Sequence, residues 1–159
     1  METALSINYS ADYELERGKA MPSKNHSVIQ NNLSGLFFMN YRKKYRFMSE
    51  ISLELENWSS TPDLAIFPKM DIDFFHDEIK MTDVPLGVIE ILSPTQGIQE
   101  LSDKAERYFL KGVKSAWLIV PSLHSIAVYN SPYTFQMFSN GIVKDEILDI
   151  EIDLNEVFS

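Results

Sequence analysis

The run from Val88 to Leu92 constrains the fold of this chain most, because it places an acid, Glu90, inside an apolar segment. A short continuous apolar run predicts a strand that is buried on both faces. A buried carboxylate is costly unless a metal ion, a lysine or a set of backbone amides pairs with it. Strands rarely bury an acid for structural reasons alone, so Glu90 is the first candidate functional residue.

The spacing of two further residues allows them to lie near Glu90. Asp63 opens the apolar run 64–67 and stands 27 positions before Glu90, and Lys104 stands 14 positions after it on a predicted helix. Two adjacent strands would bring both carboxylates to one edge of a sheet. Magnesium typically takes one or two carboxylates together with water and substrate phosphate. A lysine beside such a site holds a phosphate or positions a water. The three residues therefore suit metal-assisted hydrolysis of a phosphodiester.

A larger set of residues extends this pattern over nearly the whole chain. The set comprises residues 13–18 (YELERG), 21–26 (MPSKNH), Pro62, Asp63, 88–94 (VIEILSP), Lys104, Tyr108, Gly112, Val113, 117–121 (WLIVP) and 150–158 (IEIDLNEVF). With this set the chain resembles the Uma family, a former domain of unknown function described as restriction endonucleases. That family lies within the PD-(D/E)xK nuclease superfamily.

The resemblance implies a role for each residue of the predicted site. In the superfamily the two acids bind the metal, which implies Mg²⁺ (or Mn²⁺) held by Asp63 and Glu90 with the backbone carbonyl of Ile91. The superfamily lysine usually stands two positions after the second acid, where this chain has Leu92. The Uma pattern passes that role to Lys104. Asp63, Glu90 and Lys104 are thus the implied catalytic residues, and DNA is the implied substrate.

The chain departs from the family pattern at two positions. Lys19 follows the N-terminal glycine, where the family often has an acid, so a third acidic ligand is not supplied there. Glu100 stands four positions before Lys104, where the family often has an aspartate, and it conserves the charge.

The sequence also allows each candidate residue a purely structural role. Asp63 follows a proline, and Pro-Asp pairs are common in turns. Glu100 and Lys104 stand at i and i+4 with the acid first, the favourable order for a solvated ion pair on a helix. His26 lies just before a predicted helix, where a cap or a surface residue is expected rather than a ligand.

The composition bounds the class of protein. A length of 159 residues predicts one domain, 1–159, and 45% hydrophobic residues suffice for a core. The chain has no cysteine, which excludes disulfides and thiolate metal sites and fits a cytoplasmic protein. Neither a signal peptide nor an apolar run long enough to span a membrane is evident, so no membrane association is expected.

The net charge of −9 argues against a broad basic face for nucleic acid. Basic residues nevertheless form two local groups. These are Arg42, Lys43, Lys44 and Arg46, and Lys104, Arg107, Lys111 and Lys114. An acidic chain with such patches is still able to bind DNA.

The order of predicted elements indicates an α/β fold. We predict a restriction-endonuclease-like mixed central sheet flanked by helices, with an N-terminal hairpin and C-terminal antiparallel strands. The expected segments are a hairpin at 13–21, a helix at 27–43, strands at 46–56, 64–67, 86–92, 116–120, 125–129, 133–138 and 142–148, a helix at 99–111 and a short helix at 153–158. The turn at 140–141 is expected to join the last two strands in a hairpin, and a helical turn is expected near 74–79 in the charged loop. Strands 86–92 and 116–120 are expected to form a parallel crossover around the second helix.

Three functions remain in competition at this level. The first is a metal-dependent endonuclease that hydrolyses DNA phosphodiester bonds. The second is a catalytically inactive nuclease-fold protein that serves binding or assembly, and the third is a phosphodiesterase on RNA or nucleotides. A homodimer is also expected, because two-fold dimers are common and the C-terminal strands are rich in aromatic residues such as Tyr129, Tyr133, Phe135 and Phe138.

Overall fold

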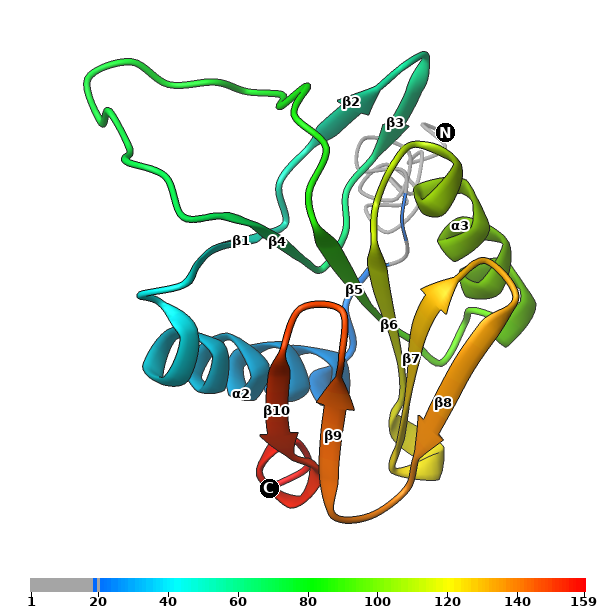
Figure 1. The fold of residues 1–159 in the computed structure, drawn as a ribbon. Coiled ribbons are helices and arrows are strands. Elements are labelled where there is room, and N and C mark those ends of the chain that lie inside the picture. The colour runs from blue at the N-terminus through cyan, green and yellow to red at the C-terminus, as the bar shows by residue number, and fades with distance from the viewer. Residues whose placement is uncertain (1–18, 20) are drawn as a thin grey trace, which may run out of the picture.

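A six-stranded mixed β-sheet forms the centre of the computed structural model, which describes Lys19 and residues 21–159 (Figure 1). Its strands lie in the order β1-β4-β5-β6-β7-β8. The elements are α2 Lys24–Tyr41, β1 Tyr45–Ser49, β2 Leu53–Leu55, β3 Trp58–Ser60, β4 Leu64–Pro68, β5 Gly87–Ile91, α3 Ile98–Leu110, β6 Ser115–Val120, the 3-10 helix η1 Pro121–Leu123, β7 Ser125–Ser131, β8 Thr134–Phe138, β9 Ile142–Asp145, β10 Ile150–Asp153 and α4 Leu154–Val157. The predicted α/β fold with a mixed central sheet is confirmed.

The unit β5-α3-β6 supplies the parallel pair of the sheet. Gly87 lies opposite Ser115 at one end of this pair, and Ile91 lies opposite Ile119 at the other. The other neighbouring strands of the sheet pair in antiparallel fashion. The parallel crossover expected from the sequence is therefore present, and β5 runs between β4 and β6 with all five residues buried.

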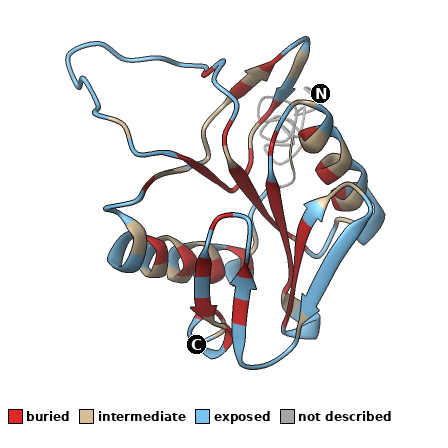
Figure 2. Cartoon of the chain, viewed as in Figure 1, coloured by how far each residue is buried: buried red, intermediate tan, exposed pale blue. Residues whose placement is uncertain are grey.

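Two layers cover the two faces of the sheet. Helix α2, the β9–β10 hairpin and α4 pack on one face, whereas α3 and the β2–β3 hairpin pack on the other. Leu64 and Ile89 belong to the first core, and their chain neighbours Ala65 and Val88 belong to the second. Figure 2 shows the central strands buried and the edge strand β8 exposed. Among the described residues no helix has the length and apolar character needed to cross a membrane.

The structure corrects several details of the expected elements. The segment 46–56 is divided into β1 and β2, because Glu50 has a φ of 57° and this left-handed conformation interrupts the extended chain. Strand β8 pairs with β7 and β9 pairs with β10, so no hairpin forms across residues 140–141. Residues 74–79 form turns and bends rather than a helical turn. The hairpin predicted at 13–21 lies outside the described residues, apart from its residues 19 and 21.

Asp145, at the end of β9, is a buried acid that the sequence analysis did not single out. Its Oδ2 atom accepts hydrogen bonds from the indole of Trp117, at 2.8 Å, and from the hydroxyl of Ser115. Its Oδ1 atom accepts from the amides of Ile147 and Leu148, each at 3.0 Å. Four neutral donors therefore satisfy this carboxylate and join the turn after β9 to strand β6.

Candidate functional site

Antiparallel pairing of β4 with β5 brings the two predicted acidic residues together. Leu64 lies opposite Ile89, so one further step of the same register places Asp63, just before β4, beside Glu90 in β5. The side chains of directly opposed residues lie on the same face of an antiparallel pair. Helix α3 packs on the face that carries Glu90 and supplies Lys104. The structure thus gathers Asp63, Glu90 and Lys104 at one end of the central strands.

Asp63 is 1% exposed and has a partner on each carboxylate oxygen. Its Oδ2 accepts a hydrogen bond from the backbone amide of Ile91 at 2.7 Å. Its Oδ1 contacts the ammonium of Lys19 and lies 3.1 Å from Nε2 of His26. Burial alone would raise the pKa of Asp63, but the hydrogen bond from His26 and the charge of Lys19 outweigh burial and lower it.

Lys19 approaches Asp63 from the N-terminal part of the chain and is surrounded by oxygen atoms. Its Nζ also donates to the carbonyl of Thr61 at 3.1 Å and lies 3.7 Å from Oε1 of Glu50. The side chain is only 9% exposed. The residue that breaks the family's acidic pattern therefore places a positive charge directly on the first acid of the site.

Glu90 has a different set of partners, Lys104 and Tyr108, and both lie on α3. Lys104 Nζ lies 2.7 Å from its Oε1, and the hydroxyl of Tyr108 donates to the same atom at 3.3 Å. Ser60, at the end of β3, hydrogen-bonds the Tyr108 hydroxyl in turn. Burial raises the pKa of Glu90; the charge of Lys104 opposes this, and the charge of Asp63 adds to it. Burial and the neighbouring Glu90 also raise the pKa of Tyr108 well above its usual value.

Lys104 pairs with Glu90 rather than with Glu100. Its side chain is 21% exposed, so the ammonium touches the buried acid and still reaches the surface. Glu100 is exposed on the first turn of α3. The spacing also allowed a solvated Glu100–Lys104 pair, but in the structure Lys104 contacts Glu90 instead.

His26 is the residue that the sequence reasoning placed wrongly. It is 2% exposed and faces Asp63, whereas a cap or a surface position was expected. Ser23 is the N-cap of α2, and its hydroxyl accepts from the His26 amide. A usable signal was present, because His26 lies three residues before Ile29 and seven before Leu33 on the buried stripe of α2. Gln30, four residues after His26, likewise reaches the site and donates to the Asp63 carbonyl at 3.2 Å.

Asp63 and Glu90 have the oxygen chemistry that magnesium or manganese requires. Among the described residues no group of three or more histidine, cysteine or acidic side chains is arranged to hold a metal ion. A two-carboxylate site with water and phosphate suits Mg²⁺ all the same. The contact recorded for Ile91 at Asp63 is made by its amide. The carbonyl of Ile91 as a ligand stays a prediction.

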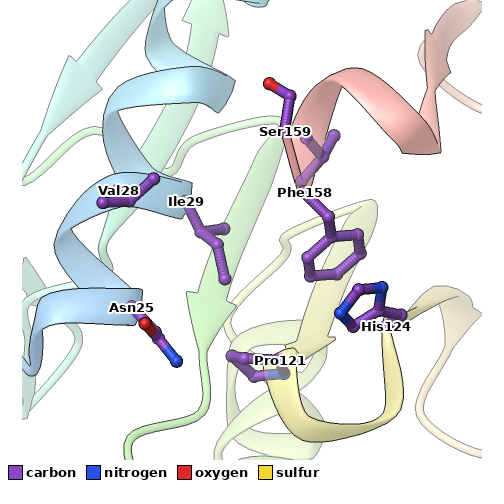
Figure 3. A pocket seen from close by; sticks show the side chains of 8 residues that line it. Asn25, Val28, Ile29, Pro121, His124, Phe158 and Ser159 are labelled. Atoms are coloured by element: carbon purple, nitrogen blue, oxygen red, sulfur yellow. The ribbon is translucent and has the colours of Figure 1, made fainter.

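A separate hollow lies between the start of α2, the η1 segment and the C-terminal residues, and neither Asp63 nor Glu90 lines it (Figure 3). Its volume is about 260 Å³, and Asn25, Ile29, His124 and Phe158 are among the residues that surround it. The rings of His124 and Phe158 stack at 4.9 Å between centroids. This stacking holds the His124 ring against the C-terminal residues.

Both the fold and the sequence of this chain match known proteins. A crystal structure described as a putative nuclease belonging to DUF820, from Anabaena variabilis, superposes with a TM-score of 0.76. It is 21% identical, and the match covers 88% of this chain and 83% of that one. The sequence model of the Uma2 family, described as "Putative restriction endonuclease", matches residues 2–155. The chain therefore belongs to the Uma2 family. Comparison with curated proteins gives no match.

Proposed function

We propose that the protein is a metal-dependent endonuclease that hydrolyses DNA phosphodiester bonds at the Asp63–Glu90–Lys104 cluster. Membership of the Uma2 family supports a nuclease in general. The observation that carries the proposal is the Lys104 ammonium, 2.7 Å from a buried acid that lies beside a second buried acid. Clusters of ionisable groups with pKa values shifted in opposite directions are typical of functional sites.

Each residue of the cluster has a distinct proposed role. Asp63 and Glu90, with the carbonyl of Ile91, would hold Mg²⁺ or Mn²⁺, which polarises a phosphate and activates a water. Lys104, fixed by Glu90 and still partly exposed, would orient the attacking water or stabilise charge on the phosphate. Tyr108 holds the Glu90 carboxylate in place through its hydroxyl.

Nicking of a supercoiled plasmid in Mg²⁺ or Mn²⁺ tests this proposal. Wild type should nick the plasmid, chelation should abolish the activity, and Glu90→Ala and Lys104→Ala should each lower the rate roughly 100-fold or more. Lys144→Ala is a matched control, because it removes an exposed lysine that pairs with Glu151 in the β9–β10 hairpin. Parallel reactions with RNA and with small phosphodiesters identify the substrate class. Equal rates for wild type and Glu90→Ala would refute the assigned site.

A second candidate function is a non-catalytic binding or assembly protein on the same fold. The contact between Lys19 and Asp63 favours it, because a lysine then neutralises the acid that would hold the metal. The net charge of −9 favours it as well, since DNA is a polyanion. Absence of cleavage of DNA, RNA and small phosphodiesters by folded wild type in both metals would favour this second function.

We further propose that the protein acts as a homodimer of single-domain chains. Strand β8 lies at the edge of the sheet and exposes Phe135 and Met137, and Tyr133 is exposed in the turn before it. Such exposed apolar edges often mark association sites. Tyr129, by contrast, is buried and stacks on Phe135, so it belongs to the core. Light scattering that finds only monomer at micromolar concentration would reject the dimer.

A further inference from the structure

Three oxygen atoms from different residues surround the ammonium group of Lys19. Its ammonium contacts Asp63 Oδ1, donates to the Thr61 carbonyl and lies 3.7 Å from Glu50 Oε1. Burial raises the pKa of Glu90, and the charge of Lys19, after that of Lys104, opposes this rise, so Lys19 is within electrostatic reach of both acids of the site. A carbonyl and carboxylates around one cation are the donor types that a hard metal ion also takes.

We infer that Lys19 is a built-in cation of this site, and that a divalent metal ion must displace it from Asp63 in order to bind. The inference rests on the proposed function only in taking Asp63 and Glu90 as the metal ligands. Its consequence is that metal binding is coupled to withdrawal of one lysine side chain. Removal of the Lys19 charge should therefore tighten metal binding.

The partners of Asp63 show why Lys19 is the group that must move. Its Oδ2 accepts from the Ile91 amide, which strand β5 fixes in place. Its Oδ1 is shared between Lys19 and the His26 ring, and His26 is fixed on the first turn of α2. Lysine alone among these three partners carries a compact charge on a flexible stem. An ammonium and a divalent ion that share one carboxylate repel each other, so binding of the ion favours its departure.

The test is the affinity for Mn²⁺, measured by calorimetry on folded protein in the absence of nucleic acid. Lys19→Met and Lys19→Gln both remove the charge, and each should bind Mn²⁺ at least about tenfold tighter than wild type, or ~1.4 kcal/mol of binding free energy. Lys19→Arg keeps the charge and should bind no tighter than wild type. Lys144→Met changes the net charge equally at an exposed site and is the control. Unchanged or weaker binding by both Lys19→Met and Lys19→Gln would overturn the inference.

Loss of the Lys19 charge also leaves Asp63 and Glu90 to repel each other, which lowers the stability of the metal-free protein. If both neutral variants are unfolded without metal, circular dichroism during a Mn²⁺ titration replaces calorimetry. The inference then expects millimolar Mn²⁺ to refold them, and failure to refold contradicts it.

Plasmid nicking by the same variants separates this inference from the proposed function. Tighter Mn²⁺ binding without cleavage by any variant would support the built-in cation and reject the nuclease. Cleavage by wild type with unchanged Mn²⁺ affinity in the neutral variants would support the nuclease and reject the built-in cation.

Discussion

Asp63 and Glu90 lie side by side, yet their surroundings shift their pKa values in opposite directions. Asp63 stands just before the start of β4, where His26 and Lys19 from the N-terminal part of the chain reach it. These partners outweigh its burial and lower its pKa. Glu90 stands inside a fully buried strand with Lys104 as its nearby cation, and burial dominates. The comparison shows that the number and charge of partners, rather than burial alone, decide the direction in which each pKa shifts.

The largest expected effect is that of Asp63→Asn. The amide removes the nearer carboxylate partner of the buried Lys19 charge, and loss of one partner of a buried pair costs about 3–5 kcal/mol of unfolding free energy. Urea denaturation of the metal-free protein measures this. Asp149→Asn, which removes the 91% exposed partner of Lys44, is the control and should leave the urea midpoint unchanged. A midpoint for Asp63→Asn equal to that of wild type would show that the Lys19 contact contributes nothing.

Lys104→Ala should have the next largest effect on stability. Its hydrogen bond to a charged partner is of the kind worth about 1.5–3 kcal/mol, and Glu90 would then be left beside Asp63 without its nearest cation. If Asp63 and Glu90 hold magnesium as proposed, it should restore part of the loss by binding to the folded state. Thermal melts of wild type and variant, with and without magnesium, make the comparison. A variant that melts like wild type in both conditions would remove Lys104 from the site.

The opposite pKa shifts predict opposite dependences of stability on pH. Asp63 has a lowered pKa, so its contribution is present above its ordinary pKa of 3.8 and is lost as the pH falls through the lower folded value. Glu90 has a raised pKa, so stability falls as the pH rises from its ordinary 4.5 through the higher folded value. In Glu90→Gln the free energy of unfolding should therefore no longer decline above pH 4.5. The loss of stability at acid pH, which comes from Asp63, should remain. Urea denaturation at several pH values across this range measures the effect. An undiminished decline in Glu90→Gln would contradict the assignment of that decline to Glu90.

The smallest expected effect is that of Glu100→Gln. Glu100 is exposed on the first turn of α3, where an acid interacts favourably with the helix dipole by less than about 1 kcal/mol. Because Lys104 contacts Glu90, the Mn²⁺ affinity of the variant should equal that of wild type. A variant with weakened Mn²⁺ binding would show that Glu100 acts on the site through Lys104.

The sequence predicted the mixed sheet because the order of strands and helices depends on local patterns. The buried run around Glu90 and the helix after it sufficed to predict the β5-α3-β6 crossover. Lys19 and His26 were not assigned to the site, because their contact with Asp63 joins segments 44 and 37 residues apart. The strand break at Glu50 depends on a single left-handed residue, which no periodicity reveals. The pairing of β9 with β10 instead of β8 is likewise a choice among equally plausible neighbours.

The hydrogen bonds of Asp145 have a consequence for the exchange of amide protons with solvent. Ile147 and Leu148 lie in the turn at 146–149, where amides ordinarily exchange fast, yet both donate to this buried carboxylate. Their protons become free when the turn at 146–149 opens away from Asp145, whose other carboxylate oxygen is held by Trp117 and Ser115 on β6. Their exchange rates should therefore report how often this turn opens, and they should be slower than those of turn amides that face solvent.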